Sequence, residues 1–190
     1  MFSLLLIIGV ILVITMVFAV TVYNTVIGRK NDVENSFATI DAYLKKRYDL
    51  IPNLVETVKT YMQYEESVLI KITELRTGMI NKDLNINNRM EASNEISKLL
   101  GGITAVLENY PDLKANNSFI ELQKTMSQIE DELAAARRTY NASVTEFNNA
   151  LEMFPTNIVA AFLKYQRKEV LSIGESERKN INIKNLFNSK

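Results

Sequence analysis

The apolar positions of this chain begin with one long, uninterrupted run. Residues 1–27 contain no charged side chain, and Arg29 and Lys30 follow almost directly. As a helix the run would extend roughly 40 Å, which exceeds the roughly 30 Å hydrocarbon core of a bilayer. A cleaved secretory signal, the alternative, usually starts with basic residues and has a shorter apolar stretch of about 7 to 15 residues. We therefore predict an uncleaved transmembrane anchor over residues 1–28.

The clearest helical pattern after the anchor is a repeat of large apolar side chains at every seventh position. Its members are Phe119, Met126, Leu133, Tyr140, Phe147 and Phe154. This period is typical of one face of a long helix that packs against a partner. Ser118 and Glu121 have the spacing of a capping box at its start, and Pro155 is expected to mark its end.

Two helical patterns lie between the anchor and residue 80. The first extends the membrane helix outward to about Tyr48, where Asp49 and Pro52 are expected to interrupt it. A second helix should begin near Pro52 and continue to Met79, before an asparagine-rich loop at residues 81–88.

A third helix is expected before Pro111, with apolar residues from Ile96 to Tyr110. Each apolar stripe covers one side only, so the helices must share a core. The predicted fold is all-α: an N-terminal transmembrane helix followed by an antiparallel four-helix bundle over residues 29–155. Residues 156–174 suit an amphipathic helix that could pack on the bundle, on lipid or on a neighbouring molecule. Residues 175–190 are expected to form a mobile tail.

Composition excludes most enzymatic and cofactor chemistry. The chain has 22 basic and 22 acidic residues, no cysteine and no histidine. Zinc sites of the Cys/His type, His-ligated haem, cysteine nucleophiles and Ser-His-Asp triads are therefore ruled out. The balanced charge lacks the basic surplus of a nucleic-acid binder. We predict a non-enzymatic protein with no cofactor, no metal site and no nucleic-acid partner.

Three stretches together resemble the LemA family of bacterial membrane-anchored proteins. They are YNTVIGRKNDVENSFATIDAYLKKRYDLIPNLVETVKTYMQYE from Tyr23, ENYPDLKANNSFIELQ from Glu108, and AAARRTYNASVTEFNNALEMFPTNIVA from Ala134. The resemblance implies an antiparallel helical bundle on one N-terminal span, with no established enzymatic activity and with relatives linked to magnetosome membranes. Two features depart from the family. Tyr64 stands where many members have histidine, and the end AFLKYQRKEVLSI lacks the usual Phe-Gly-Phe close.

One polar pair is predicted at the interruption of the first helix. Arg47 falls on the apolar face of that helix, and an antiparallel turn at residues 49–52 would bring Glu56 beside it. We expect an Arg47–Glu56 ion pair that fixes the geometry of the hairpin, since polar residues in a helical seam usually specify register. Ligand binding by the pair is the alternative.

A second buried charge is predicted at Glu65, which lies between apolar positions of the second helix. An unpaired charge there would cost several kcal/mol, so Glu65 should pair with Arg76, Arg137 or Arg138. A functional carboxylate or cation site is the alternative, although one carboxylate provides too few ligands for a metal.

A polar group on the long helix could select a packing partner. Arg137, Arg138, Tyr140 and Asn141 follow the small residues 134–136, which would let two helices approach closely. The cluster could pack within one chain, or it could contact a second copy of the chain, because arginine is enriched at interfaces.

These observations favour a structural protein that self-associates and scaffolds or shapes a bacterial cell membrane, with the bilayer and other copies of itself as partners. The basic residues after the span favour a single-pass topology with the bundle in the cytoplasm. The alternative is a membrane-bound sensor or binding module in which tyrosines in the bundle accept a small ligand or a peptide. Hydrolysis by carboxylates alone is a third hypothesis.

Overall fold

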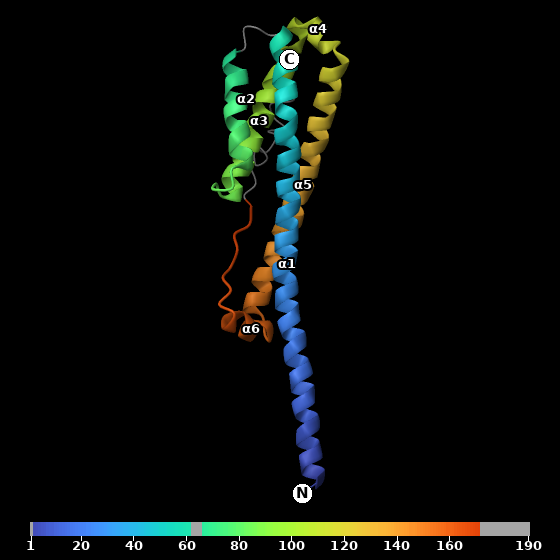
Figure 1. The fold of residues 1–190 in the computed structure, drawn as a ribbon, viewed down its shortest axis with the longest axis vertical. Coiled ribbons are helices and arrows are strands. Elements are labelled where there is room, and N and C mark those ends of the chain that lie inside the picture. The colour runs from blue at the N-terminus through green and yellow to red at the C-terminus, as the bar shows by residue number, and fades with distance from the viewer. Residues whose placement is uncertain (1, 62–65, 172–190) are drawn as a thin grey trace, which may run out of the picture. The chain divides into compact units, whose positions relative to one another are not determined.

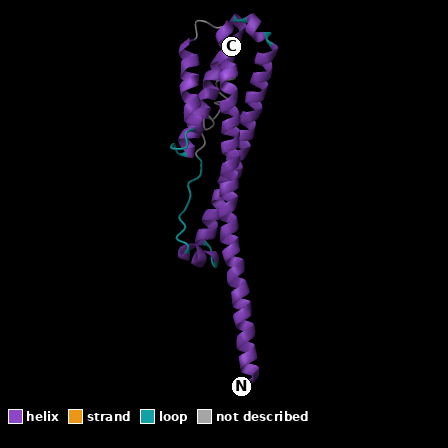
Figure 2. Ribbon diagram, in the orientation of Figure 1, coloured by secondary structure: helices purple, strands orange, loops and turns teal. Residues whose placement is uncertain are grey.

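The computed structural model describes residues 2–61 and 66–171, and every regular element in these ranges is a helix (Figures 1 and 2). The elements are α1 (Phe2–Tyr61), α2 (Glu66–Ile80), α3 (Ile86–Val106), the 3-10 helix η1 (Leu107–Asn109), α4 (Pro111–Lys114), α5 (Asn117–Glu152) and α6 (Thr156–Phe162). The predicted all-α class is confirmed. The predicted tail, residues 175–190, lies outside the described residues.

The first part of α1 has the length and composition of a membrane span. Its most apolar window has a mean hydropathy of 3.1, and 6% of that window is buried. The apolar side chains from Phe2 to Val20 are exposed, as expected of a surface that lipid would cover. Within the described residues, α1 is the one helix that meets these criteria for crossing a membrane.

Contacts divide the chain into two compact units. Unit 1 comprises residues 1–42 and 132–170, and unit 2 comprises residues 43–131 and 171–190. Since α1 and α5 are continuous across these boundaries, each helix contributes one part to each unit.

The predicted interruption at residues 49–52 is wrong, because α1 continues through Pro52 to Tyr61. Pro52 has no backbone N–H, so the carbonyl of Tyr48, four residues earlier, loses its helical donor. Arg76 of α2 replaces that donor, and its Nε lies 3.1 Å from the Tyr48 carbonyl oxygen. A tertiary contact therefore supports the helix where its own hydrogen bonding fails.

A single helix from Pro52 to Met79 is also wrong. α1 ends at Tyr61, residues 62–65 are outside the description, and α2 begins at Glu66. The Arg76 guanidinium lies 3.7 Å from the centre of the Tyr48 ring. This contact is incompatible with one straight helix from Pro52 to Met79, because such a helix would carry Arg76 far from Tyr48. α2 packs closely on α3, where a Cβ added to Gly78 would lie 3.3 Å from the Cβ of Ala92.

The third helix begins earlier than its apolar pattern indicates. Asn85 is its N-cap and accepts a hydrogen bond from the Asn88 N–H at 2.8 Å, which satisfies one of the free donors of the first turn. α3 then passes through Gly101 and Gly102 to Val106, and Pro111 starts α4 instead of ending a helix.

The predicted long helix corresponds to α5, although its cap differs from the prediction. Asn116, not Ser118, accepts the hydrogen bond from the Phe119 N–H at 3.0 Å. The seven-residue repeat is buried from Phe119 to Phe147. Phe154 is 77% exposed, because α5 ends at Glu152 before the repeat reaches it.

The segment after α5 is tied back to that helix within unit 1. The helix predicted over residues 156–174 is present only as α6, which ends at Phe162, and residues 163–171 form no helix. Beyond it, the Asn148 side chain donates to the Lys168 carbonyl at 2.9 Å and accepts from the Lys168 N–H at 3.0 Å. The Tyr165 ring packs against Phe147, with 6.0 Å between the ring centres.

Candidate functional site

The candidate site is built around Arg47 of α1, whose side chain is 2% exposed. Helical spacing puts position 47 on the same face as the buried Leu44 and Ile51. The charged side chain of Arg47 therefore lies among apolar residues. Nη1 of Arg47 donates to Ser93 Oγ at 2.8 Å, and Nη2 donates to Ser97 Oγ at 2.6 Å. Both serines belong to α3, so Arg47 joins two helices of unit 2.

Arg47 is only partly satisfied by its surroundings. Its Nε is buried without a hydrogen-bond partner among the described residues. Oε2 of Glu130, on α5, lies 4.0 Å from Nη2, and the Glu130 side chain is 57% exposed. That distance is longer than a charge-assisted hydrogen bond, which measures about 2.7–2.9 Å. Burial lowers the pKa of the Arg47 guanidinium, and the Glu130 charge acts in the opposite direction.

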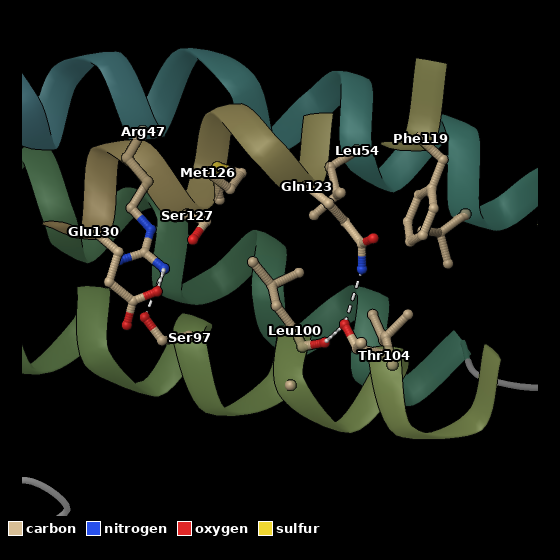
Figure 3. Close-up of a pocket in the computed structure, with 13 residues that line it drawn as sticks. Arg47, Leu54, Ser97, Leu100, Thr104, Phe119, Gln123, Met126, Ser127 and Glu130 are labelled. Atoms are coloured by element: carbon tan, nitrogen blue, oxygen red, sulfur yellow. Dashed lines mark hydrogen bonds and ion pairs between the residues drawn. The ribbon is translucent and has the colours of Figure 1, made fainter. Parts of the chain in front are cut away.

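The guanidinium borders a pocket of about 320 Å³ that α1, α3 and α5 enclose within unit 2. Figure 3 shows Arg47, Ser97 and Glu130 at one end of this pocket and Phe119 at the other. Between them, Gln123 Nε2 donates to Thr104 Oγ1 at 2.9 Å and links α5 to α3. The pocket is therefore polar at one end, where Arg47 and Glu130 carry opposite charges, and apolar at the other.

The predicted Arg47–Glu56 ion pair is wrong. The prediction required a turn at residues 49–52, but α1 is continuous there. Arg47 and Glu56 consequently lie roughly 13 Å apart along one helix axis. Glu56 is exposed and borders a separate pocket with Lys59 and Arg76.

Glu65 lies outside the described residues, so its expected pairing stays a prediction. One of its three expected partners, Arg76, contacts the carbonyl and the ring of Tyr48.

The polar cluster predicted on α5 is divided between two faces of the helix. Arg137 and Tyr140 are buried, whereas Arg138 is exposed. Successive helical residues point about 100° apart, so neighbours in sequence do not share a face. Tyr140 packs on Phe37 of α1 with 6.4 Å between ring centres, and burial raises the pKa of its hydroxyl. Asn141 is half-buried.

Comparison with known proteins places these features in a family. A match to the LemA family covers residues 36–185. The chain belongs to the LemA family. Protein LemA of Metamycoplasma hominis is 30% identical over 173 residues, which cover 87% of this chain and 79% of that protein.

More distant relatives of this LemA family chain are named magnetosome proteins. Magnetosome protein MamQ 2 of Paramagnetospirillum magneticum is 23% identical over 172 residues, covering 77% of this chain and 63% of that protein. Magnetosome protein MamQ of Magnetospirillum gryphiswaldense is 20% identical over the same length. The family match includes the whole Arg47 pocket and begins after the apolar run of α1.

The serine partners of Arg47 in this LemA family member were missed by sequence reasoning. Ser93 and Ser97, the partners of Arg47, are one helical turn apart on α3, and Ser93 is fully buried. Both serines lie close to Ile96 in the apolar stripe of this helix, and that position was the sequence feature that could have indicated buried polar partners.

A further set of exposed apolar side chains follows α5 and continues on α6, and we call it the α6 patch. It consists of Met153, Phe154, Ile158 and Phe162, with exposed fractions of 63%, 77%, 62% and 87%. The amphipathic pattern predicted for residues 156–174 indicated part of it. Several large apolar side chains exposed within one short segment are typical of a contact surface for protein or lipid.

Proposed function

We propose that this protein is a non-enzymatic, membrane-anchored scaffold that self-associates and organises or shapes a bacterial membrane. The observation that carries the proposal is the α6 patch, which belongs to the same compact unit as the apolar span of α1. A body with one transmembrane anchor and a second lipid contact would be held at a defined orientation on the bilayer.

Contacts within unit 1 support the position of the α6 patch near the membrane surface. Arg29 of α1 lies 3.4 Å from Glu146 of α5, and Phe37 packs on Tyr140. From the first contact to the second, the residue number increases along α1 and decreases along α5, which supports an antiparallel arrangement of the two helices. From Glu146 to Glu152, α5 advances about 9 Å, so it ends at about the level of Tyr23. Tyr23 is 46% exposed, and tyrosine is enriched where helices leave the hydrocarbon core.

Contacts within unit 2 support the antiparallel four-helix arrangement of the remaining chain. Arg76 of α2 contacts Tyr48 of α1. Asn116, which directly precedes α5, donates to the hydroxyl of Tyr61 at the end of α1 at 3.1 Å. A bundle of this kind would present the outer faces of its helices to neighbouring molecules. Anchoring in a membrane raises the effective concentration of these faces, so weak contacts suffice for assembly.

The charge distribution and the relatives support the expected location. Arg29, Lys30, Lys45 and Lys46 follow the span within about twenty residues, which favours a cytoplasmic body. The relatives named magnetosome proteins support a role at a membrane.

The lipid contact can be tested with a single tryptophan, because the chain has none. In full-length protein reconstituted into liposomes with brominated acyl chains, the Phe162→Trp variant should show quenched, blue-shifted emission. Leu84→Trp, at a 37% exposed position of unit 2, is the matched control and should show neither change. Equal quenching of both variants, or of neither, contradicts the proposed contact.

Self-association is tested by the mass of the extracted full-length protein. A regular assembly of many copies supports the scaffold, a ligand-stabilised monomer supports the sensor alternative, and substrate turnover supports an enzyme. Ala135→Cys introduces the sole cysteine at an exposed position of α5. A disulfide-linked dimer of this variant in the membrane would support α5 as a contact between copies.

A further inference from the structure

We propose that the Arg47 pocket binds a small amphiphilic carboxylate, with its carboxylate at Arg47 and its apolar chain directed toward Phe119. This inference goes beyond the proposed scaffold, and it concerns unit 2 alone, so it does not depend on assembly or on the α6 patch.

The first argument is the unmet hydrogen bonding of a buried cation. A buried charge is costly unless an opposite charge and hydrogen bonds satisfy it. Two donors of Arg47 contact serine hydroxyls, which are neutral, and Nε has no partner among the described residues. Arginine has five N–H donors in a planar fork that matches a carboxylate. A carboxylate entering the pocket would supply the counter-charge that the two serines lack.

The second argument is the division of the pocket into two ends. Arg47, Ser97 and Ser127 provide hydrogen-bond donors at one end, and Leu54 and Phe119 lie toward the other (Figure 3). An inorganic anion would leave the apolar end unfilled, and a hydrocarbon would leave Arg47 unpaired. A molecule with both parts fits the whole lining.

The third argument is size. Small-molecule sites usually enclose about 300–1,000 Å³, and this pocket, at about 320 Å³, is at the lower limit. The volume suits a short chain and excludes a two-chain phospholipid.

Glu130 is the group that opposes binding. Its carboxylate borders the pocket 4.0 Å from Nη2 of Arg47, so it would repel a ligand carboxylate at close range. Its exposed side chain is free to turn toward solvent. Removing its charge should therefore strengthen ligand binding.

The experiment is calorimetric titration of sodium octanoate into the full-length protein in lipid nanodiscs, with the heat of empty nanodiscs subtracted. We expect saturable binding of octanoate and none of octan-1-ol or acetate at the same concentrations. Glu130→Gln should bind octanoate more tightly. Arg47→Met should weaken binding about tenfold or more, since it removes a hydrogen-bonded charge.

A pair of adjacent glycines provides a variant that keeps Arg47 intact. Gly101 borders the pocket and Gly102 does not. A Cβ at either position would meet no atom within 4 Å. Both substitutions to leucine should be tolerated in a helix, because leucine favours helix far more than glycine does. Gly101→Leu should block octanoate binding, whereas Gly102→Leu should bind like the wild type.

Three results would overturn the proposal. They are octanoate heats equal to those of empty nanodiscs, equal binding by the two leucine variants, and wild-type affinity in a folded Arg47→Met variant. If Arg47→Met does not fold, the two glycine variants decide the question.

Discussion

Arg76 donates a hydrogen bond from Nε to the carbonyl of Tyr48 at 3.1 Å, at the one carbonyl that Pro52 deprives of its helical partner. The guanidinium also stacks on the Tyr48 ring, 3.7 Å from its centre. A single side chain of α2 thus satisfies the backbone of α1 and fixes the position of α2 beside it. This contact supports α1 at the position where Pro52 removes a backbone donor.

Replacing Arg76 with methionine should lower the free energy of unfolding by about 1–3 kcal/mol, through loss of a hydrogen bond and a cation–π contact. The loss should be smaller in a Pro52→Ala background, where the alanine N–H can bond the Tyr48 carbonyl itself. Thermal unfolding of the detergent-solubilised full chain, followed by circular dichroism, measures all four members of the cycle. Lys71→Met, an exposed change in the same helix, is the control. Strictly additive effects would contradict the coupling.

Asn148 should control the attachment of the segment after α6. Asn148→Ala removes both hydrogen bonds to the Lys168 backbone, and two lost bonds at a buried site should cost about 1–3 kcal/mol locally. Trypsin should then cleave after Arg167 and Lys168 faster than in the wild type. Asn149→Ala alters the neighbouring exposed position and serves as the control. Unchanged cleavage of the Asn148 variant would contradict the attachment.

Tyr140 should make unit 1 sensitive to alkaline pH. Burial raises the pKa of its hydroxyl in the folded protein, so folding favours the protonated form. The resulting stability is fully present below the usual tyrosine pKa of about 10 and is lost as the pH rises through the higher folded pKa. The melting temperature of the wild type should fall more between pH 9 and pH 11 than that of Tyr140→Phe. Tyr43→Phe, at a half-buried tyrosine, controls for general alkaline effects.

Lys164 should be replaceable by glycine with a gain in stability. It follows α6 with a φ of 54°, and the Tyr165 N–H bonds the Ala160 carbonyl at 3.1 Å, the pattern of a Schellman cap. A non-glycine residue in this left-handed conformation costs about 1–2 kcal/mol, so Lys164→Gly should raise the melting temperature. Gln166→Gly, two residues later, should lower it slightly by adding chain entropy. A lower melting temperature for Lys164→Gly would contradict the cap.

The pattern of apolar residues was sufficient to predict the helical class, the apolar span and the buried repeat of α5. These features depend on local spacing: an apolar run of membrane length and side chains that recur on one helical face. Phe119 to Phe147 are buried where the repeat places them. The same local rules failed at Pro52, because the donor that keeps α1 helical comes from Arg76, 24 positions away in the sequence.

The partners of Arg47 were decided by tertiary structure for the same reason. Its place on an apolar face could be predicted from helical spacing, and its burial follows from that place. The choice of Ser93, Ser97 and Glu130 over Glu56 depends on which helices pack beside α1. A sequence specifies the face that a side chain occupies through backbone geometry, but contacts between distant helices arise only when their apolar faces are buried together.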